Sequence, residues 1–192
     1  MSMELQEGQI ILEDVRVGYP TLFRAMPVKN EPEGKKRFSL RPYLPKSNKA
    51  TKARIDKEIA RIVRDELQGV MPPKDKIFLV DGDEKTDDDI AKGHWVISAN
   101  RPEKDKQGRL NPPAVTHRNR KPAKEEDNPV YGGCRCNVLI SIYLQKKWKR
   151  ICAQLEVVQF IADDEPFGAP RVDPESVMPE MPNDDGDGDF GI

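Results

Sequence analysis

The sequence contains no apolar run that approaches the roughly 20 residues needed to span a membrane. It has three cysteines, an odd number that argues against a disulfide framework and favours a reducing compartment. Glycine-rich phosphate loops of Walker or Rossmann type are missing, and His94 and His117 have no evident nucleophile partner. The N-terminus is acidic and polar and shows no secretory signal. We therefore expect a cytoplasmic protein that is not an enzyme and does not contact a membrane.

Two groups of residues could hold a metal ion, and both fit poorly. Cys134 and Cys136 lack the two-residue gap of a zinc knuckle, and we expect strand alternation to point their side chains to opposite faces. The acidic stretch of residues 81–89 fails the EF-hand spacing, because Lys85 occupies a ligand position. We interpret this stretch as an acidic surface loop, and we expect no metal and no cofactor.

The charges are distributed unevenly along the chain. Residues 163–192 hold 10 acidic residues and one basic residue, Arg171, so this segment carries −9. The other 31 basic and 23 acidic residues give residues 1–162 a charge of +8. A basic body attracts polyanions, and an acidic terminal segment is typical of interaction tails. The formal net charge of −1 therefore hides a basic domain joined to an acidic tail.

The final ten residues combine aspartates with glycines and one aromatic ring. Such a segment buries too little apolar surface to offset the entropy of ordering, so we expect a disordered tail that binds partner proteins. Its expected contact residues are Asp184, Asp185, Asp187, Asp189 and Phe190. We divide the chain into a nucleic-acid-binding domain, residues 1–162, and a proline-rich linker with an acidic tail, residues 163–192.

The hydrophobic pattern predicts a mainly β protein with one inserted helix. Strands are expected at residues 9–17, 35–44, 76–80, 93–99, 134–144 and 148–161. Apolar residues at helical spacing predict a helix over residues 48–67. A turn is expected at residues 18–23 and a long basic loop at residues 100–128. The economical architecture is an OB-fold-like Greek-key β-barrel, with a β-sandwich as the alternative.

Basic and aromatic residues interleave at several points, as binding of single-stranded nucleic acid without sequence preference requires. Cations would follow the phosphates while exposed rings stack on bases. The residues expected to make these contacts are Tyr19, Phe23, Lys35, Arg37, Arg41, Tyr43, Lys46, Trp95, Arg101, Tyr131, Arg135, Lys147 and Trp148. Rings on strands also commonly belong to the core, and we interpret Phe38 and Phe160 in that way. Among the others, the favoured stacking residues are Tyr19, Tyr43, Tyr131 and Trp148.

Five short segments, in their order along the chain, resemble the family of phage single-stranded DNA-binding proteins long catalogued as a domain of unknown function. They are GYPTLF at 18–23, GKKRFSL at 34–40, DGD at 81–83, GHW at 93–95 and YGGCRCNV at 131–138. The resemblance covers about residues 15–160. It implies an OB-fold that binds single-stranded DNA during phage replication, recombination or repair in the host cell cytoplasm.

The acidic tail resembles the tails of bacterial and podophage single-stranded DNA-binding proteins, which contact replication and recombination proteins. Those tails usually end on phenylalanine, whereas Gly191 and Ile192 follow Phe190 in this chain. Three alternatives stay open. They are an RNA-binding or RNA-chaperone barrel, a metal-dependent nuclease that uses residues 81–89, and a phage scaffolding protein without DNA affinity. The sequence leaves the oligomeric state undetermined, with a homodimer as one option.

Overall fold

The computed structural model describes residues 4–28, 35–85 and 87–168. The long strands are β1 (Gln9–Pro27), β2 (Lys36–Pro45), β7 (Arg135–Gln145) and β8 (Arg150–Ala162). The short strands are β3 (Leu79–Asp81), β4 (His94–Ile97), β5 (Ala99–Pro102) and β6 (Ala114–Thr116). Helical elements are α1 (Lys49–Glu66) and the single turns η1 (Lys74–Lys76), η2 (Gly82–Glu84) and η3 (Lys146–Trp148). Within these ranges the protein is therefore mainly β with one α-helix, as predicted.

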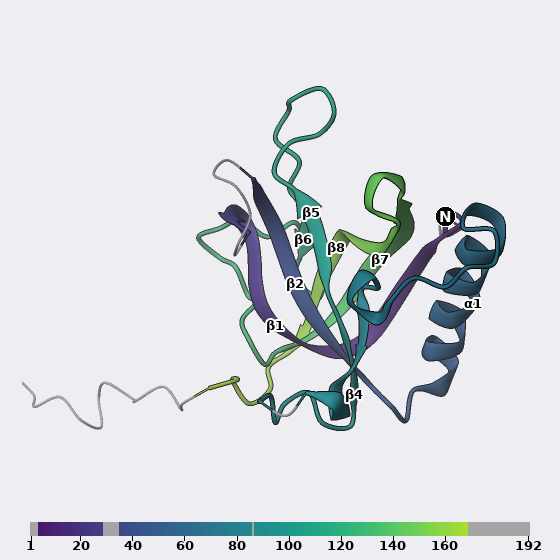
Figure 1. The fold of residues 1–192 in the computed structure, drawn as a ribbon. Coiled ribbons are helices and arrows are strands. Elements are labelled where there is room, and N and C mark those ends of the chain that lie inside the picture. The colour runs from purple at the N-terminus through teal and green to yellow at the C-terminus, as the bar shows by residue number, and fades with distance from the viewer. Residues whose placement is uncertain (1–3, 29–34, 86, 169–192) are drawn as a thin grey trace, which may run out of the picture.

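Strands β1, β2, β5, β7 and β8 close into a barrel (Figure 1). β1 pairs antiparallel with both β2 and β7, and β7 pairs antiparallel with β8. The ring is completed by β5, which lies parallel to β8 and antiparallel to β2. A five-stranded Greek-key barrel of this kind is the OB architecture. The predicted OB-like fold class is confirmed.

β1 is longer than the sequence pattern indicates, because it forms part of two sides of the barrel. Its register is irregular between Leu12 and Val15 against β7, and between Gly18 and Thr21 against β2. Bulges of this kind bend a strand and increase its twist. The predicted turn at residues 18–23 is wrong, because the chain continues there as strand. Tyr19, with φ of 50°, lies at the second irregularity.

β2 follows the predicted alternation. Phe38 and Leu40 are buried in the barrel, while Arg37, Ser39 and Arg41 lie on its outer face. Pro42 lies where β2 changes partner, since residues 37–40 pair with β5 and residues 43–45 pair with β4. A residue without an N–H group interrupts the hydrogen-bond ladder least at such a position.

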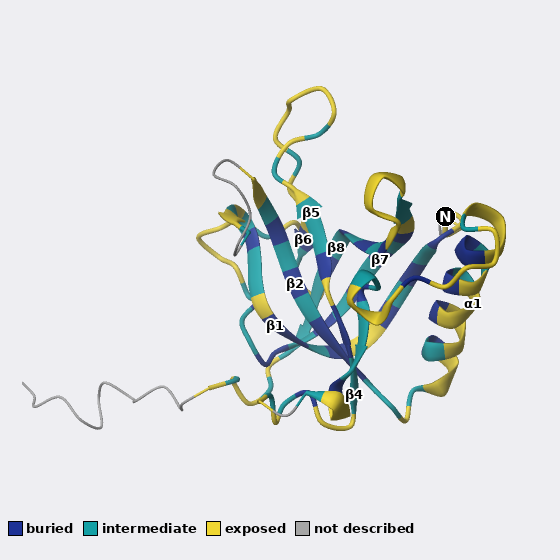
Figure 2. Ribbon diagram, viewed as in Figure 1, coloured by how far each residue is buried: buried dark blue, intermediate teal, exposed yellow. Residues whose placement is uncertain are grey.

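α1 covers one end of the barrel and packs against β1 and β7 (Figure 2). It begins after Asn48, whose side chain accepts a hydrogen bond of 3.1 Å from the Thr51 N–H and so caps the helix. Ile55, Ile59 and Ile62 form its buried face. The helix expected over residues 48–67 is present, with one capping residue at each end.

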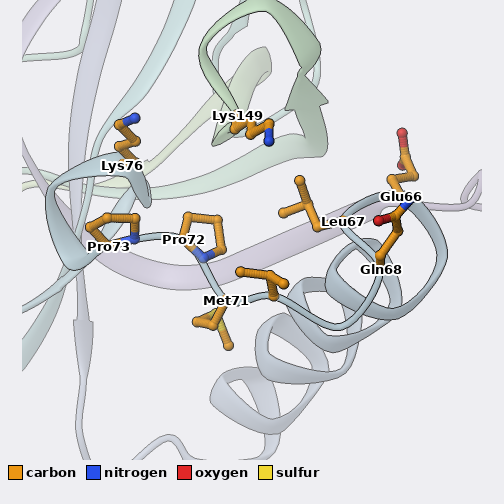
Figure 3. Close-up of a pocket in the computed structure, with 9 residues that line it drawn as sticks. Glu66, Leu67, Gln68, Met71, Pro72, Pro73, Lys76 and Lys149 are labelled. Atoms are coloured by element: carbon orange, nitrogen blue, oxygen red, sulfur yellow. The ribbon is translucent and has the colours of Figure 1, made fainter.

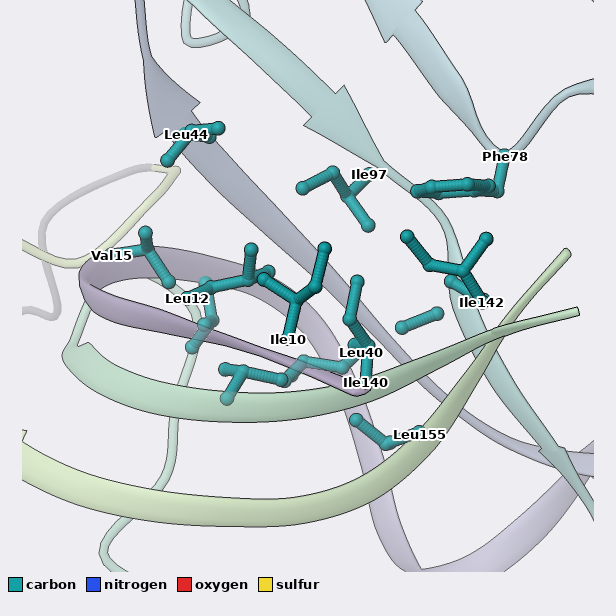
Figure 4. Packing of buried hydrophobic residues seen from close by; sticks show 14 of the residues in the cluster. Ile10, Leu12, Val15, Leu40, Leu44, Phe78, Ile97, Ile140, Ile142 and Leu155 are labelled. Atoms are coloured by element: carbon teal, nitrogen blue, oxygen red, sulfur yellow. The ribbon is translucent and has the colours of Figure 1, made fainter. Parts of the chain in front are cut away.

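The core fills the barrel with aliphatic side chains from every long strand (Figure 4). Ile10 and Leu12 of β1 meet Ile140 of β7 and Leu155 of β8, all at most 2% exposed. Burial of each such side chain stabilises the fold by about 1.5–3 kcal/mol. In the part of the chain that the structure describes, no helix is long and apolar enough to cross a membrane.

Candidate nucleic-acid interface

A groove of about 620 Å³ lies on the outside of the barrel, between the β1–β2 connection and the β7–β8 turn. Residues from β2, β5, β8 and η1 line it. Its basic side chains are Lys35, Arg37, Lys74, Lys76 and Arg150. Asp75 is the carboxylate that lines it, and the Asp75 carbonyl oxygen accepts a hydrogen bond of 3.1 Å from Arg150. The groove is therefore a surface with an excess of positive charge.

Two aromatic rings belong to this surface. Trp148, in the β7–β8 turn, lines the groove and is 56% exposed, and the Lys147 Nζ lies 5.2 Å from its ring centroid. Tyr143 is the cross-strand partner of Cys152, which also lines the groove. Burial raises the pKa of Tyr143, while the nearby charge of Arg37 acts in the opposite direction. Rings and cations thus alternate here over one continuous area.

A third ring, that of Tyr19 on β1, extends this surface along the neighbouring strand β2. The Tyr19 ring is 68% exposed, and the Arg41 guanidinium carbon lies 4.7 Å from its centroid. The hydroxyls of Thr21 and Ser39 share a hydrogen bond of 2.8 Å between Arg41 and the groove. Arg37 and Arg41 lie on the same face of β2, so this outer face connects Tyr19 to the groove.

The structure brings together a subset of the predicted contact residues. Lys35, Arg37 and Trp148 line the groove, Lys147 lies beside it, and Arg41 and Tyr19 adjoin it along β2. Phe23 packs partly against the core. The remaining predicted residues lie elsewhere and have partners of their own.

Tyr43 is only 1% exposed, so the prediction of an exposed stacking ring is wrong for this residue. Its place on β2 is on the outer face, but other segments cover it. The ring of Phe167 meets it edge-on, with a centroid distance of 5.4 Å, and the ring of His94 does the same at 6.2 Å. Ala91 and Val96 complete this small second cluster.

Lys46 and Trp95 belong to a separate cluster around the acidic stretch. The Lys46 Nζ lies 2.6 Å from the Asp81 Oδ1 and also binds the Asp83 carboxylate. These bonds raise the pKa of Lys46 and lower the pKa of Asp81, while the backbone N–H of Gly93 is the main cause of the lowered pKa of Asp83. The ammonium groups of Lys46 and Lys52 lie 5.0 and 4.3 Å from the Trp95 ring centroid. A lysine ammonium therefore occupies the position that a metal ion would need.

The two remaining arginines hold distant segments together. Arg101 binds the Glu156 carboxylate and donates two hydrogen bonds to Asn111, at 2.7 and 3.0 Å. Arg135 forms a bidentate pair with Asp14, both distances being 2.7 Å, and reaches Asp164 at 3.3 Å. The pair with Asp14 raises the pKa of Arg135. A phosphate would have to displace these carboxylates to bind either guanidinium.

Residues 163–168, called the C-terminal clasp below, pack against the barrel. The Tyr131 Oη donates a hydrogen bond of 3.0 Å to Asp163 and accepts one of 3.1 Å from the Asp164 N–H. The Phe167 N–H donates to the Gly132 carbonyl at 2.9 Å. Tyr131 therefore anchors this segment. The sequence did not predict this packing, and the tail residues Asp184, Asp185, Asp187, Asp189 and Phe190 lie outside the described residues.

Cys134 and Cys136 are both buried, with their sulfur atoms 3.7 Å apart. The expectation that they point to opposite faces is wrong, because residues two apart along an extended chain share a face. Their contact raises the pKa of Cys136 and lowers that of Cys134. Across residues 4–28, 35–85 and 87–168, no group of three or more His, Cys, Asp or Glu side chains is placed to hold a metal ion.

The predicted contact residues did not include several residues of this surface: Lys74, Lys76, Asn100, Tyr143 and Arg150. A signal existed for Tyr143, because it alternates with the buried Ile140 and Ile142 along β7 and so points outward. For Lys74 and Lys76 no local signal existed, because only the barrel brings η1 next to β8.

Comparisons with known proteins identify the family of this chain and proteins with a similar fold. The family model described as "Enterobacter phage Enc34, ssDNA-binding protein" matches residues 8–188. No curated protein shows a significant sequence match. The solved structure of the single-stranded DNA-binding protein from bacteriophage Enc34 in complex with ssDNA is similar, with a TM-score of 0.70 and 28% identity over 87% of this chain and 97% of that chain.

A second solved structure of the single-stranded DNA-binding protein from bacteriophage Enc34 gives a TM-score of 0.66 and 29% identity, over 91% of this chain and 96% of that chain. The single-stranded DNA-binding protein gp2.5 of bacteriophage T7 gives a TM-score of 0.53 over 90% of this chain and 96% of that chain. Its identity of 17% supports a shared fold only.

Proposed function

The chain belongs to the Enc34 family of phage single-stranded DNA-binding proteins, and we propose that it binds single-stranded DNA without sequence preference in the groove and along the outer face of β2. One observation carries this proposal. The groove joins five basic side chains and the exposed Trp148 on the face and loops that OB-folds use for oligonucleotides. The similar Enc34 protein has been solved in complex with ssDNA, which supports it further.

Each kind of side chain has a distinct role in this proposal. Arg37 and Lys76 pair with phosphates and release counterions, which makes affinity depend on salt. Trp148, Tyr143 and Tyr19 stack on bases, each worth about 1–3 kcal/mol. Because every base has an aromatic face, stacking tolerates any sequence.

Family membership also bears on catalysis. The relatives are single-stranded DNA-binding proteins, which bind their ligand and do not transform it, so the prediction that this chain is not an enzyme is confirmed. The finer role is a proposal. We place the protein in the host cell cytoplasm, where it protects exposed strands during replication, recombination or repair of phage DNA.

The acidic tail regulates binding in this proposal. Residues 163–192 carry −9 against +8 for residues 1–162, so the tail can compete with DNA for the basic surface at high effective concentration. DNA binding then frees Phe190 and its neighbouring aspartates to contact replication or recombination proteins. A homodimer is a separate prediction, which sedimentation analysis would test.

The decisive experiment is fluorescence anisotropy of the full chain with labelled oligo-dT, oligo-U and duplex DNA of equal length. Oligo-dT should bind most tightly, because stacking requires unpaired bases. Trp148→Ala should weaken oligo-dT binding about tenfold or more. Equal affinity for duplex DNA would overturn the proposal, and preference for oligo-U would favour an RNA-binding protein that reads the 2′-OH.

The tail is tested in the same assay without shortening the chain. Changing Asp184, Asp185, Asp187 and Asp189 together to Asn keeps the length and removes four charges. This variant should bind oligo-dT more tightly than the native chain at low salt, where screening is weak. If the two affinities agree at low ionic strength, competition by the tail is wrong.

A further inference from the structure

A pocket of about 400 Å³ lies outside the groove, where β2 pairs with β4. Tyr43 of β2 and its cross-strand neighbour Arg16 of β1 line it, together with Phe167 of the C-terminal clasp. Ile90 and His94 line its other side. We call it the Tyr43 pocket. Its volume falls within the range of about 300–1,000 Å³ that is typical of small-molecule sites.

The hydroxyl of Tyr43 is buried and makes no hydrogen bond to any residue that the structure describes. The large majority of buried hydroxyls are hydrogen-bonded, because an unpaired one costs free energy. Burial, and then the charge of Asp88, raise the pKa of Tyr43, whereas the charge of Arg41 acts in the opposite direction. The hydroxyl therefore lies toward Arg41, and it can still accept or donate a hydrogen bond.

The pocket beyond the C-terminal end of α1 differs in this respect (Figure 3). It has a similar volume of about 390 Å³, and Leu67, Met71 and Pro72 supply part of its apolar lining. Within the described ranges, no buried polar side-chain atom without a partner lines it. The unpaired hydroxyl therefore distinguishes the Tyr43 pocket.

The charged groups around the Tyr43 pocket are balanced, which disfavours a phosphate there. Lys92 lines the pocket but is paired with Asp89 at 2.6 Å. The Arg16 Nε donates to the Gly133 carbonyl at 3.0 Å, and the same guanidinium binds the Glu165 carbonyl. A neutral, planar group with donors and acceptors of its own suits these surroundings better, and a nucleobase is such a group.

The Tyr43 pocket continues the outer face of β2. Arg41 and Tyr43 are two positions apart on this face, a distance of about 7 Å along the strand, and the Tyr19 ring lies beside Arg41. From Arg37 in the groove to Tyr43, six residues of strand span about 20 Å. Because an OB-fold covers about 4–16 nucleotides, a strand bound in the groove is long enough to reach the pocket.

We propose that one nucleobase of the bound strand enters the Tyr43 pocket, contacts the Phe167 ring and forms a hydrogen bond with the Tyr43 hydroxyl. A phenolic hydroxyl both donates and accepts, so the site accommodates any base. The base reaches the shielded hydroxyl when the Phe167 ring turns, while the Phe167 N–H keeps its bond to the Gly132 carbonyl. The inference rests on the proposed function and adds to it a base-binding site outside the groove.

Tyr43→Phe removes the hydroxyl and keeps the ring. Since the hydroxyl has no partner in the described protein, the melting temperature should stay within about 2 °C of the native value or rise. Affinity for oligo-dT of about 16 nucleotides should fall about threefold or more, measured by fluorescence anisotropy of the full chain. A lower melting temperature with unchanged affinity would give the hydroxyl a structural role and overturn the proposal.

Two variants serve as controls. Met71→Ala changes an exposed side chain in the pocket beyond α1 and should leave oligo-dT affinity unchanged. Tyr131→Phe removes a hydroxyl that bonds Asp163 and Asp164, so it should lower the melting temperature by about 2 °C or more. An equal loss of thermal stability in Tyr43→Phe and Tyr131→Phe would contradict the unpaired state of the Tyr43 hydroxyl.

Photo-crosslinking locates the base. 5-Iododeoxyuridine replaces one thymidine at a time along the oligonucleotide, and the linked residues are identified by mass spectrometry after irradiation. Positions near one end should link to Tyr43, His94 or Phe167. Interior positions should link to Tyr19 or Trp148. The absence of a crosslink to the Tyr43 pocket from every position would overturn the proposal.

The same crosslinks separate this inference from the proposed function. Links to Tyr19 or Trp148 with none in the Tyr43 pocket defeat the pocket proposal alone. Absence of oligo-dT binding by the native chain defeats the proposed function, and this inference with it.

Discussion

The ring of Phe167 meets the ring of Tyr43 edge-on, with centroids 5.4 Å apart and planes at 78°. The Arg16 guanidinium carbon lies 4.4 Å from the centroid of the same Phe167 ring. Phe167 belongs to the C-terminal clasp, whereas Tyr43 lies on β2 and Arg16 on β1. The contact therefore fastens the start of the acidic segment to the barrel, and the clasp becomes part of the folded domain.

Replacement of Phe167 by Ala should lower the free energy of unfolding by about 1–3 kcal/mol, because the edge-on ring contact and the cation–π contact are both lost. Chemical denaturation of the full chain measures this change. Trp148→Ala is the control, since its exposed ring should matter for DNA binding and little for stability. Equal loss of stability in the two variants would contradict the role of the clasp.

Gly133 has φ of 112°, and a Cβ atom at this position would lie 2.3 Å from the Glu165 carbonyl oxygen. Gly133→Ala should therefore displace the clasp and lower the free energy of unfolding by about 2–4 kcal/mol. Gly69→Ala is a matched control, because φ is 80° there but nothing lies within 4 Å. It should lower stability by only about 1 kcal/mol. Thermal melts of both variants measure the two losses of stability. A larger loss in Gly133→Ala than in Gly69→Ala shows that the close approach to Glu165 destabilises the fold in addition to the backbone strain.

The clasp should weaken in acid. The pKa of Asp164 is lowered from its ordinary value of 3.8, first by the backbone N–H of Glu165 and then by Arg16 and Arg135. A lowered folded-state pKa means that the ionised carboxylate stabilises the fold above the ordinary value, and that this contribution is lost as pH falls through the lowered value. Asp164→Asn should be less stable than the native chain near pH 7, and the difference should close as pH falls below 3.8 and through the lowered pKa of Asp164. A difference that persists in acid would show that the charge is not responsible.

Replacement of Arg37 and replacement of Arg135 should change the salt dependence of oligo-dT affinity to different extents. Arg37 lines the groove, so Arg37→Ala should weaken oligo-dT binding and flatten the plot of log K against log salt by about 0.7. Arg135 is held by Asp14 and Asp164, so Arg135→Ala should lower stability by about 1 kcal/mol and change the slope less. Equal flattening by both variants would show that DNA displaces the carboxylates from Arg135.

The acidic stretch should neither bind Mg²⁺ nor cleave DNA, because Lys46 occupies the space between Asp81 and Asp83. Titration calorimetry with Mg²⁺ or Mn²⁺ should give no heat of binding at this site, and labelled DNA should stay intact. Lys46→Ala tests whether the lysine is what excludes the metal ion, since this change frees the carboxylates of Asp81 and Asp83. Cleavage by the native chain would revive the nuclease alternative.

Local patterns predicted the elements whose form depends on nearby residues. The helix was predictable because Asn48 caps it and Ile55, Ile59 and Ile62 repeat at its period. β2 was predictable because buried and more exposed side chains alternate along residues 37–41. β1 was predicted too short, because Gly18 and Pro20 favour a turn in isolation, whereas pairing with β2 on a bulged strand keeps the chain extended.

The site was harder to predict, because partners far along the chain decide which basic and aromatic residues are left for DNA and which are paired or buried elsewhere. Arg101 pairs with Glu156, and Arg135 pairs with Asp14, at separations of 55 and 121 residues. Tyr43 has the position of an exposed residue on β2, but Phe167, Ala91 and two β4 residues, His94 and Val96, cover it. The cysteine pair is different, since the two-residue period of a strand already places Cys134 and Cys136 on one face.

β1 has a consequence for the timing of folding. The Asp14 N–H donates to the Asn137 side chain 123 residues later, and Arg16 donates to the Glu165 carbonyl 149 residues later. The side of β1 that pairs with β7 therefore cannot form its hydrogen bonds until β7 has been synthesised. Barrels with such distant pairings fold slowly, in milliseconds to seconds, after the loop entropy has been overcome. A newly made chain thus closes its barrel only after β7 and β8 have been synthesised, and β1 must avoid pairing with other chains during that interval.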